Sequence, residues 1–473
     1  MLKPGVVQRS VGVRVGAKSR DVEEACPADL APAHDSSLLR VLPFVLLASL
    51  GALLFGYHLG VVNAALVPLS AELAISSASV QGAVVSAVLA GACVGSFVGG
   101  PLADAVGRVR TLRLAALPLG IGALLCGLAQ SAGPLLLGRL VCGVGLGVAS
   151  TVCPLYISEI APPAHRGVLG SANQLCICLG ILGALLAGLP LAAHPGAWRS
   201  MFNVAALPAL ALFVLAPLAP DSPAWLLRVG RQDEARAAAA RLWGSAEALA
   251  AGGEGCEGAA AWRDLVSPAH ARATVVAAGL FVVQQFAGIN AVVYFSNSVF
   301  RAAGLGSDTL ASAAVGVVNV VGTAVAARSL DRAGRRPMLL ASFAGMAAAM
   351  LLLSATLSLP LLAPVAAPLS LIGTLAYVAA FAAGAGPIPS LLVAELYPPQ
   401  LRGKGQSVAL LAHWVCNFAI GQGFLQAVQA VGVAAVYAFF ASVCAAGVAF
   451  VALRVPETRS RSYEEVAAAL AVL

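Results

Sequence analysis

Charged side chains are scarce in this chain of 473 residues, where Asp, Glu, Lys and Arg together make up 10%. Soluble proteins of ordinary composition carry about 25% charged residues. With so few charges, too few polar helix faces remain to meet water around a large soluble core. The composition therefore argues against a water-soluble protein and indicates one that lies in a membrane.

Hydrophobic residues make up 60% of the chain. They gather in stretches near twenty residues, the length that a helix needs to cross the apolar core of a bilayer. The predicted fold class is an all-α membrane protein with twelve transmembrane helices. The predicted helices are 42–66, 80–103, 112–130, 134–156, 168–190, 199–218, 273–299, 309–328, 337–359, 365–393, 406–426 and 430–453.

Carboxylates are missing from these twelve stretches, although the chain holds 21 Asp and Glu. Metal-site spacing is missing too, because Cys176 and Cys178 form a C-x-C pair without zinc-site spacing or nearby partners. No nucleophile–base pair or ligand set converges at one depth. We therefore predict no metal, no cofactor and no enzymatic reaction.

Basic residues are scarce on one side of the predicted membrane. Of the 28 Lys and Arg, only Arg139, Arg199 and Arg301 fall on the side away from the termini. This positive-inside pattern places both termini on the side from which insertion starts, the cytosol or its organellar equivalent. The net charge of +7 therefore reports topology. Basic residues scattered over short loops, without interleaved aromatics, predict no nucleic-acid partner.

Two short charged patterns occur twice. D-x-x-G-R follows the second and the eighth predicted helix, with Asp104 and Asp331 separated by 227 positions. E-x6-R-G follows the fourth and the tenth helix, with Glu159 and Glu395 separated by 236 positions. The matched positions indicate that the chain consists of two related six-helix halves.

A third repeated pattern supports the division into two six-helix halves. The first prolines of 220-PDSPAWL-226 and 456-PETRSRS-462 are also 236 positions apart. Parallel repeats of this kind build many transporters that rock about a site at the midplane of the membrane. The predicted segments are an N-terminal tail (1–40), a first half (41–218), an inner-face helical loop (219–271), a second half (272–455) and a C-terminal tail (456–473).

The repeated acids and arginines predict ion pairs at the inner face. Each acid and each arginine lies at the end of neighbouring helices, so pairing would hold the helix ends together, and alternating access would separate some pairs. One such motif could be ordinary loop charges that set topology, but four at matched positions favour a gate. The predicted gate network is Asp104, Arg108, Glu159, Arg166, Asp331, Arg335, Glu395 and Arg402.

These motifs resemble those of the sugar porter family of the major facilitator superfamily. The resemblance rests on the D-x-x-G-R pair, P-x-Y-x-x-E-I-x-x-x-x-x-R-G, P-[DE]-S-P-x-W-L and the terminal P-E-T, and it covers roughly residues 41–465. Within that family, 55-FGYHLGVVN-63, 107-GRVRT-111 and 411-LAHWVCNF-418 most resemble the plastidic glucose translocators of plants and algae. The resemblance implies a membrane transporter of glucose or a related hexose.

Amides and aromatic rings in the predicted membrane helices are the candidate sugar ligands. A sugar site needs donors, acceptors and a ring face, and the seventh helix crowds Gln284, Gln285, Asn290 and Tyr294 into one short length. Gly288 lies between Gln284 and Asn290 and predicts a break in the helix. The break would let both of these side chains turn inward. The alternative for any single amide is a helix–helix hydrogen bond, which is common in membranes.

The resemblance adds positions in other helices. In sugar porters, the positions that match Gln174, Gln284, Gln285, Asn290, Asn319, Trp414 and Asn417 line the central site. Phe381 and His413 are further candidates, since His413 shares a helix face with Asn417. At Ala382 and Ser390, glucose facilitators of animal type usually carry Glu and Trp, so those two contacts are not expected here. Pro387 and Pro389 predict a bend in the tenth helix.

His58 stands where proton-driven symporters of this family carry Asp. Because no coupling carboxylate remains, we predict a facilitator and a neutral His58 that is hydrogen-bonded to a neighbouring helix. One alternative is a proton–hexose symporter that uses His58, whose unperturbed pKa lies near 6.5. Another is a non-transporting sugar sensor, which would be expected to carry a long extra tail after 456-PET-458.

The tails and the central loop carry the remaining predictions. Residues 1–20 hold five basic and no acidic side chains, which is typical of plastid or mitochondrial transit peptides and equally of a disordered cytosolic tail. The resemblance favours the chloroplast inner envelope, with the plasma membrane as the alternative.

Residues 231–244 predict a surface helix that Gly244 ends, and residues 251–261 predict a flexible linker. The expected partners are a hexose and the lipid bilayer, and the expected working unit is a monomer.

Overall fold

The computed structural model describes residues 36–162, 165–191, 194, 196–245, 261–302, 304, 308–398, 400–459 and 461–472. Within these residues, twelve helices are long and apolar enough to cross a membrane, which confirms the predicted fold class. Helices suit this environment because lipid offers no partner for a free backbone N–H or C=O group. The predicted transit segment and most of the predicted linker lie outside the described residues.

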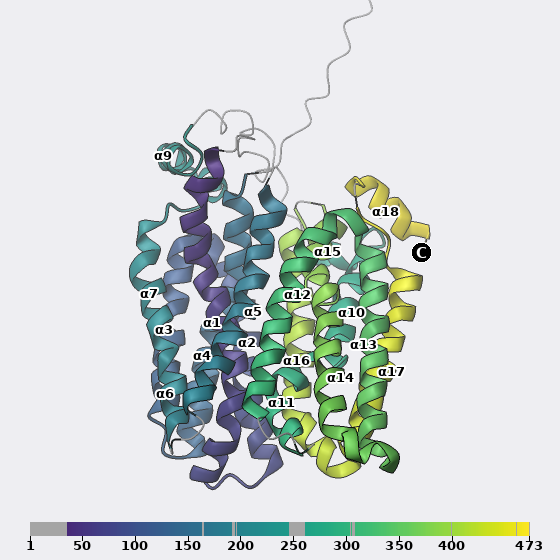
Figure 1. Ribbon diagram of the computed structural model, residues 1–473. Coiled ribbons are helices and arrows are strands. Elements are labelled where there is room, and N and C mark those ends of the chain that lie inside the picture. The colour runs from purple at the N-terminus through teal and green to yellow at the C-terminus, as the bar shows by residue number, and fades with distance from the viewer. Residues whose placement is uncertain are drawn as a thin grey trace, which may run out of the picture.

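The first half of the chain forms one bundle, coloured purple to teal in Figure 1. Most of its spans are single helices, and the sixth is divided at Ala205. The bundle consists of α1 (Ser36–Glu72), α2 (Ala78–Val106), α3 (Arg108–Gly127), α4 (Ala132–Ile160), α5 (Arg166–Leu191), α6 (Ala197–Val204), α7 (Ala206–Leu215) and the short η3 (Ala216–Leu218).

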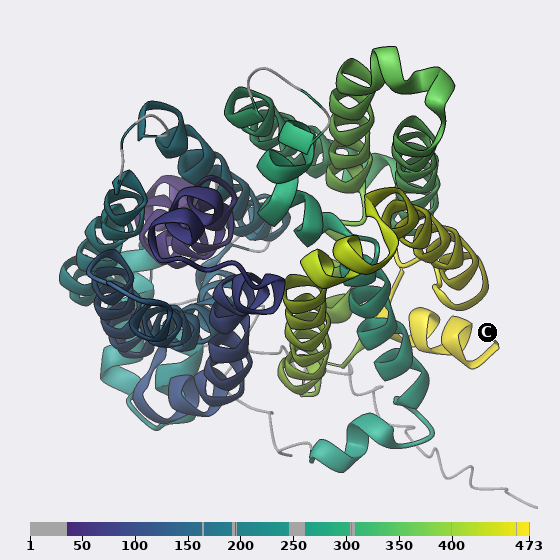
Figure 2. The same ribbon diagram turned by 90° about the horizontal axis from the view of Figure 1, so that it is seen from below.

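The second half forms a bundle beside the first, coloured teal-green to yellow, and Figure 2 shows the two bundles side by side. It consists of α10 (Ala271–Phe286), α11 (Ile289–Ala302), α12 (Asp308–Ala333), α13 (Arg335–Ser358), η6 (Pro360–Val365), α14 (Ala366–Ala383), α15 (Ile388–Leu396), α16 (Arg402–Val431) and α17 (Val433–Arg454).

Short helices cover the face that carries the C-terminus, at the top of Figure 1. They are α8 (Pro223–Arg228), α9 (Gln232–Trp243), η5 (Trp262–Val266) and α18 (Tyr463–Val472). Helix α9 confirms the helix predicted over 231–244, and Gly244 ends it in the left-handed conformation, with φ of 82°. The indole N–H of Trp243 donates a hydrogen bond to the carbonyl of Ile160 (3.0 Å), which ties α9 to the end of α4.

Two spans of the second half are broken where the sequence predicts it. Helix α10 ends at Phe286 and α11 begins at Ile289, with Gly288 between them at φ of +98°. Only glycine adopts such a φ without strain. Helix α14 ends at Ala383 and α15 begins at Ile388, across the segment that contains Pro387. Both breaks leave backbone groups without partners in their own helix, close to the middle of the membrane.

The two halves meet where α1 contacts α11, α2 contacts α16 and α5 contacts α12. The hydrogen bonds that join the halves lie in the middle of the membrane or on the side away from the termini, here called the outer side. These hydrogen bonds therefore hold the two halves together on the outer side.

Candidate functional site

A relay of amide side chains surrounds the break between α10 and α11. The Nε2 of Gln284 donates to the carbonyl of Ala385 (2.5 Å) and lies 3.3 Å from the carbonyl of Gly386. These carbonyls belong to the break between α14 and α15, so Gln284 supplies a donor that the broken helix lacks. The two breaks therefore face each other, and one side chain joins them.

The relay continues through Gln285, which lies next to Gln284. The Nε2 of Gln285 lies 3.1 Å from the Oε1 of Gln284 and 2.8 Å from the Nδ1 of His413 on α16. The Oε1 of Gln285 accepts a hydrogen bond from the Nδ2 of Asn290. Because the positive φ of Gly288 turns the chain, residues on both sides of the break reach the same place.

Helix α16 adds aromatic rings and free donors beside this relay. The hydroxyl of Tyr294 donates to the Oδ1 of Asn417 (2.9 Å). The ring of Trp414 lies edge-on to those of His413 (centroids 4.8 Å apart) and Phe55 (5.2 Å), and Phe55 comes from the other half. Within the described residues, Trp414 Nε1 and Asn417 Nδ2 are buried and find no hydrogen-bond partner. A ligand rich in hydroxyl oxygens would satisfy both donors.

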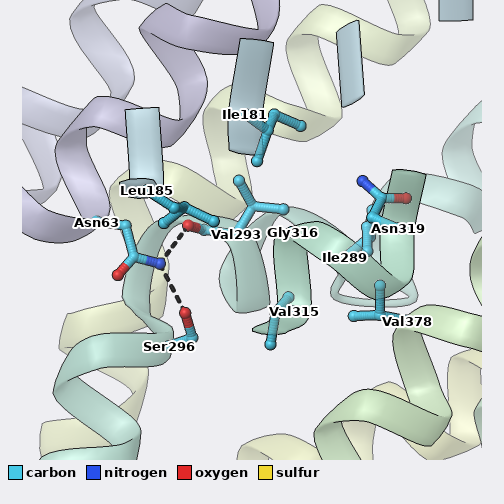
Figure 3. Close-up of a pocket in the computed structure, with 10 residues that line it drawn as sticks. All are labelled: Asn63, Ile181, Leu185, Ile289, Val293, Ser296, Val315, Gly316, Asn319 and Val378. Carbon is cyan, nitrogen blue, oxygen red and sulfur yellow. Dashed lines mark hydrogen bonds between the residues drawn. The ribbon is translucent and has the colours of Figure 1, made fainter. Parts of the chain in front are cut away.

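Asn319 and Phe381 lie on neighbouring helices of the same half. Asn319 lines a narrow pocket between α1, α5, α11, α12 and α14, and its Oδ1 is also buried without a partner within the described residues. Figure 3 shows its amide on one side of this pocket and Asn63 on the other. The pocket leaves about 10 Å³ for the centre of a water molecule, room for about one water. Phe381 is 8% exposed on α14.

The side chain of Gln174 contacts a sulfur of its own helix. Its Nε2 approaches the Sγ of Cys178 (3.8 Å), and that sulfur lies 3.4 Å from the hydroxyl of Thr323 on α12. Among the described residues it forms no hydrogen bond with the amides around the break. Ala382 is buried and Ser390 is exposed, so neither adds a large side chain to the site.

His58 is fully buried, and its ring differs from the prediction. Neither ring nitrogen has a hydrogen-bond partner within the described residues, so the predicted bond to a neighbouring helix is not formed. Its backbone carbonyl instead accepts a hydrogen bond from Arg139 (3.0 Å). The position of the ring in α1 is set by close helix packing, because Gly56 and Gly60 on the same helix touch the backbone of α5.

Arg139 is the residue of this region that sequence reasoning missed. It lies inside α4, is 1% exposed, and donates to the carbonyls of Val84 (3.1 Å) and Val85 (3.3 Å) as well as to that of His58. Three carbonyls, without any described carboxylate, thus surround a permanent positive charge. A basic residue inside a predicted apolar stretch was the signal, because such residues in membranes are usually functional.

Three of the four first-half residues of the predicted inner-face network, Asp104, Arg108 and Glu159, lie together. Arg108 is 1% exposed and forms two hydrogen bonds to Glu159, from Nε and from Nη2, both of 2.8 Å. Its Nη1 donates to Asp104 (3.0 Å) and to the carbonyl of Ala103 (2.9 Å). Arg228 of α8 adds a second cation, 3.2 Å from Asp104. The ends of α2, α3 and α4 are thereby joined to the inner-face loop.

The second half repeats this arrangement around Arg335. Arg335 donates to Glu395 from Nη2 (3.0 Å) and Nε (3.2 Å), and its Nη1 donates to the carbonyl of Leu330 (3.1 Å). Leu330 corresponds to Ala103 in the repeat. Arg402 donates to the carbonyl of Tyr397 (3.2 Å) and forms no ion pair with a described acid. The side chains of Arg166 and Asp331 lie outside the described part of the structure.

Two acids of the third repeated pattern were missed as members of this network. Asp221 accepts a hydrogen bond from the backbone N–H of Arg108 (2.9 Å), and Glu457 accepts one from that of Arg335 (3.0 Å). Each carboxylate therefore caps the helix that begins with the network arginine, where unpaired N–H groups favour a negative charge. The repeat of the acid one residue after Pro220 and Pro456 was the signal that could have found them.

The pKa values of these two carboxyl groups shift in opposite directions. Burial raises the pKa of Asp221, and its hydrogen bonds to backbone N–H groups do not fully offset this. For Glu457, burial alone would raise the pKa, but four backbone N–H donors outweigh it and hold the pKa below its usual value.

Within the described residues, no group of three or more His, Cys, Asp or Glu could hold a metal ion.

Comparison with known proteins agrees with this architecture. Residues 44–470 match the family described as "Sugar (and other) transporter". Plastidic glucose transporter 4 of Arabidopsis thaliana is 49% identical, with 98% of this chain and 86% of that protein covered. The mouse solute carrier family 2, facilitated glucose transporter member 4, is 34% identical, with 89% of each chain covered.

Among solved structures, the proton:xylose symporter XylE bound to 6-bromo-6-deoxy-D-glucose superimposes with a TM-score of 0.77 at 27% identity. The match covers 92% of this chain and 100% of that one. The chain therefore belongs to the sugar (and other) transporter family, whose members are multi-pass membrane transporters and not enzymes.

Proposed function

We propose that this chain moves glucose or a related hexose across its membrane by facilitated diffusion with alternating access. The proposal is supported by a buried set of amides, a phenol and aromatic rings at the broken helices, which suits a neutral, hydroxyl-rich ligand. It is supported also by the names of its relatives, which include plastidic and facilitated glucose transporters.

One observation carries the proposal: the unpartnered donors Trp414 Nε1 and Asn417 Nδ2 lie buried beside the relay of Gln284, Gln285 and Asn290. Buried donors without partners are costly, and a bound sugar would supply the missing acceptors. We propose as the sugar-contacting set Gln174, Gln284, Gln285, Asn290, Tyr294, Asn319, Phe381, His413, Trp414, Asn417 and His58.

Facilitated diffusion is favoured over proton coupling by the charges around His58. Arg139 holds a permanent positive charge beside it, and no described acid balances that charge. A protonated His58 would add a second positive charge in the same buried place. The competing candidate is proton–hexose symport, which is favoured by the unpartnered His58 ring and by the structural similarity to a proton:xylose symporter.

Uptake of labelled glucose into liposomes that contain the purified full chain distinguishes the two candidates. The expected result is equilibration of glucose, with no accumulation when a pH gradient is imposed, in the wild type and in His58→Asn alike. Accumulation that disappears in His58→Asn would establish symport instead. Absence of any glucose uptake, with uptake of another neutral sugar, would contradict the assignment of a hexose.

We also propose that the eight predicted network residues form the inner gate. The described pairs, Arg108–Glu159 and Arg335–Glu395, each stay within one half. Their role would then be to hold the inner helix ends of each half as a rigid unit that moves as one. We propose the division of the chain into halves 41–218 and 272–455, with the loop 219–271 between them.

For the compartment, we propose the chloroplast inner envelope, on the strength of the relatives named as plastidic. Expression of the full chain with a C-terminal fluorescent protein in plant cells tests this directly. Signal that follows a plastid envelope marker supports the proposal, and signal at the cell surface supports the alternative, the plasma membrane.

We propose that the working unit is a monomer. Mass measurement of the purified chain in nanodiscs tests this proposal.

A further inference from the structure

Gln422 is an amide side chain in a membrane-spanning helix that reaches across to the other half of the molecule. Its Nε2 donates a hydrogen bond to the carbonyl of Ser79 (3.0 Å), and its Oε1 accepts one from the hydroxyl of Ser86 (2.8 Å). Both partners lie on α2, which is separated from Gln422 by 336 to 343 positions in the sequence. One side chain thus uses its donor and its acceptor on the same opposing helix.

Gly82 lets the two helices come close enough for these bonds. A Cβ at Gly82 would lie 2.4 Å from the carbonyl oxygen of Gln422, so the backbones of α2 and α16 touch at this point. Ser79, Gly82 and Ser86 are three and four positions apart and therefore share one face of α2. We call Ser79, Gly82, Ser86 and Gln422 the α2–α16 clasp.

The α2–α16 clasp lies on the outer side of the membrane. Helix α2 begins at Ala78, directly after the outer loop, and α16 ends on the same side at Val431. Gln422 lies five positions beyond Asn417 of the proposed sugar site, on the same helix. The α2–α16 clasp therefore lies between that site and the outer end of α16, and it shares no residue with the relay.

We propose that Gln422 is a positioning residue that stabilises the outward-closed state and thereby sets the balance between the two access states. This inference rests on the alternating access proposed above. The two hydrogen bonds exist only while α2 and α16 are together, since opening the outer side exposes both ends to water. Their contribution therefore differs between the states, which is what a change in population requires.

Three variants of the full chain test the clasp. Gln422→Met keeps the length of the side chain and removes its donor and acceptor. Gly82→Ala leaves Gln422 intact but places a Cβ against its carbonyl, so it separates the helices by a different route. Gln426→Met is the matched control, because Gln426 is exposed and donates to the carbonyl of Gln422 within its own helix.

Hydrogen–deuterium exchange of each variant in lipid nanodiscs, without sugar, supplies the readout. We expect the outer ends of α2 (78–89) and α16 (418–431) to exchange about tenfold faster in Gln422→Met and in Gly82→Ala, since two hydrogen bonds are lost or displaced. The inner ends of α4 (157–160) and α15 (392–396) should exchange more slowly, because opening outside closes the inner side. Gln426→Met should match the wild type.

Faster exchange at the outer ends without slower exchange at the inner ends would overturn the proposal, because it would show a local structural role only. Unchanged exchange in both Gln422→Met and Gly82→Ala would overturn it as well. Because no sugar is present, these outcomes are independent of the uptake assay, so failure of the clasp is distinguishable from failure of the hexose assignment.

Discussion

Two buried arginines show how differently this protein accommodates a guanidinium. Arg108, at the inner face, has carboxylate partners in Asp104 and Glu159, whereas the hydrogen bonds of Arg139, inside α4, go only to carbonyls among the described residues. A carbonyl carries a partial charge and a carboxylate a full one, so the two sites differ in net charge. The first is a balanced structural pair, and the second leaves a net positive charge next to the proposed sugar path.

Removing the charge of Glu159 should strongly destabilise the inner end of the first half. Glu159→Gln leaves Arg108, which is 1% exposed, without its two-bond partner, and breaking a buried pair in this way costs about 3 to 5 kcal/mol. We expect a lower thermal unfolding midpoint in detergent and a large loss of glucose uptake in liposomes.

The control is Glu234→Gln, which breaks the exposed pair with Arg231 on α9. Exposed pairs contribute about 0 to 1 kcal/mol, so this variant should behave like the wild type. If Glu159→Gln and even the charge reversal Glu159→Lys transported sugar at the wild-type rate, the residue would have no part in a gate.

Acidification should affect the two capping acids in opposite directions. The pKa of Glu457 is lowered in the folded state, so its stabilisation is present above about pH 4.5 and is lost as the pH falls below that value. The pKa of Asp221 is raised, so its contribution is largest below about pH 3.8 and is lost as the pH rises through the folded-state value.

Unfolding midpoints of Glu457→Gln and Asp221→Asn, measured between pH 7 and pH 3.5, check this prediction. The difference between the wild type and Glu457→Gln should shrink on acidification. The wild type should gain relative to Asp221→Asn over the same range. Parallel pH profiles for the two variants would show that the two caps do not differ in this way.

The broken helices are the elements on which the site depends. Helices α10 and α11 meet at Gly288, and α14 and α15 meet across Gly384 to Pro387, so each break exposes backbone groups beside the relay. Gln284 spans the two breaks by donating to Ala385. A continuous helix in either place would satisfy its own carbonyls and leave this amide without its partner.

Gly288→Ala should therefore impair transport more than an ordinary substitution of glycine. Alanine at φ of +98° is strained, and its Cβ would meet the ring of Phe440 at 2.4 Å. We expect a loss of stability of about 1 to 3 kcal/mol and a marked fall in the rate of glucose uptake.

Gly423→Ala is the matched control for Gly288→Ala. Gly423 lies within α16, and nothing lies within 4 Å of an added Cβ. Alanine is the better helix former by about 1 kcal/mol, so this variant should be as stable as the wild type or more so. Equal transport by the two alanine variants would exclude a special role for the break.

At the scale of the whole molecule, the two halves are also joined by hydrogen bonds other than those of the α2–α16 clasp. Asn63 of α1 donates to the carbonyl of Val293 and to the hydroxyl of Ser296, both at 2.6 Å, and accepts from the N–H of Asn297 (3.2 Å), as Figure 3 shows in part. These bonds join α1 to α11, at a different place from the α2–α16 clasp. Both sets must separate if the outer side opens.

Asn63→Ala should consequently also change deuterium exchange in α2 and α16, the pair of helices that meets at the α2–α16 clasp. If the halves move as units, loss of these bonds raises deuterium exchange at the outer ends of α2 and α16 as well as in α11, by about tenfold. The control is Asn203→Ala in α6, since Asn203 packs against Gly127 within the first half. An effect of Asn63→Ala that stays confined to α1 and α11 would argue for local motion instead.

Much of this architecture follows from local features of the sequence. The twelve spans follow from the lengths of the apolar runs, the two breaks from Gly288 and from Pro387 and Pro389, and the orientation from the uneven distribution of basic residues. The crowding of Gln284, Gln285 and Asn290 in one span also marked the relay in advance. Each of these features needs only residues that are neighbours along the chain.

The partners of the buried polar groups were decided by tertiary structure alone. Arg139 reaches carbonyls of α1 and α2, and Asn63 and Gln422 find partners 230 to 343 positions away in the other half. Which helix faces lie opposite one another depends on how twelve helices pack, and close approaches such as that of Gly82 to α16 set that packing. The sequence by itself determined which elements form and where they bend. Only the packed structure determined which of their polar groups meet, because hydrogen bonds act over about 3 Å and the residues that form them are hundreds of positions apart.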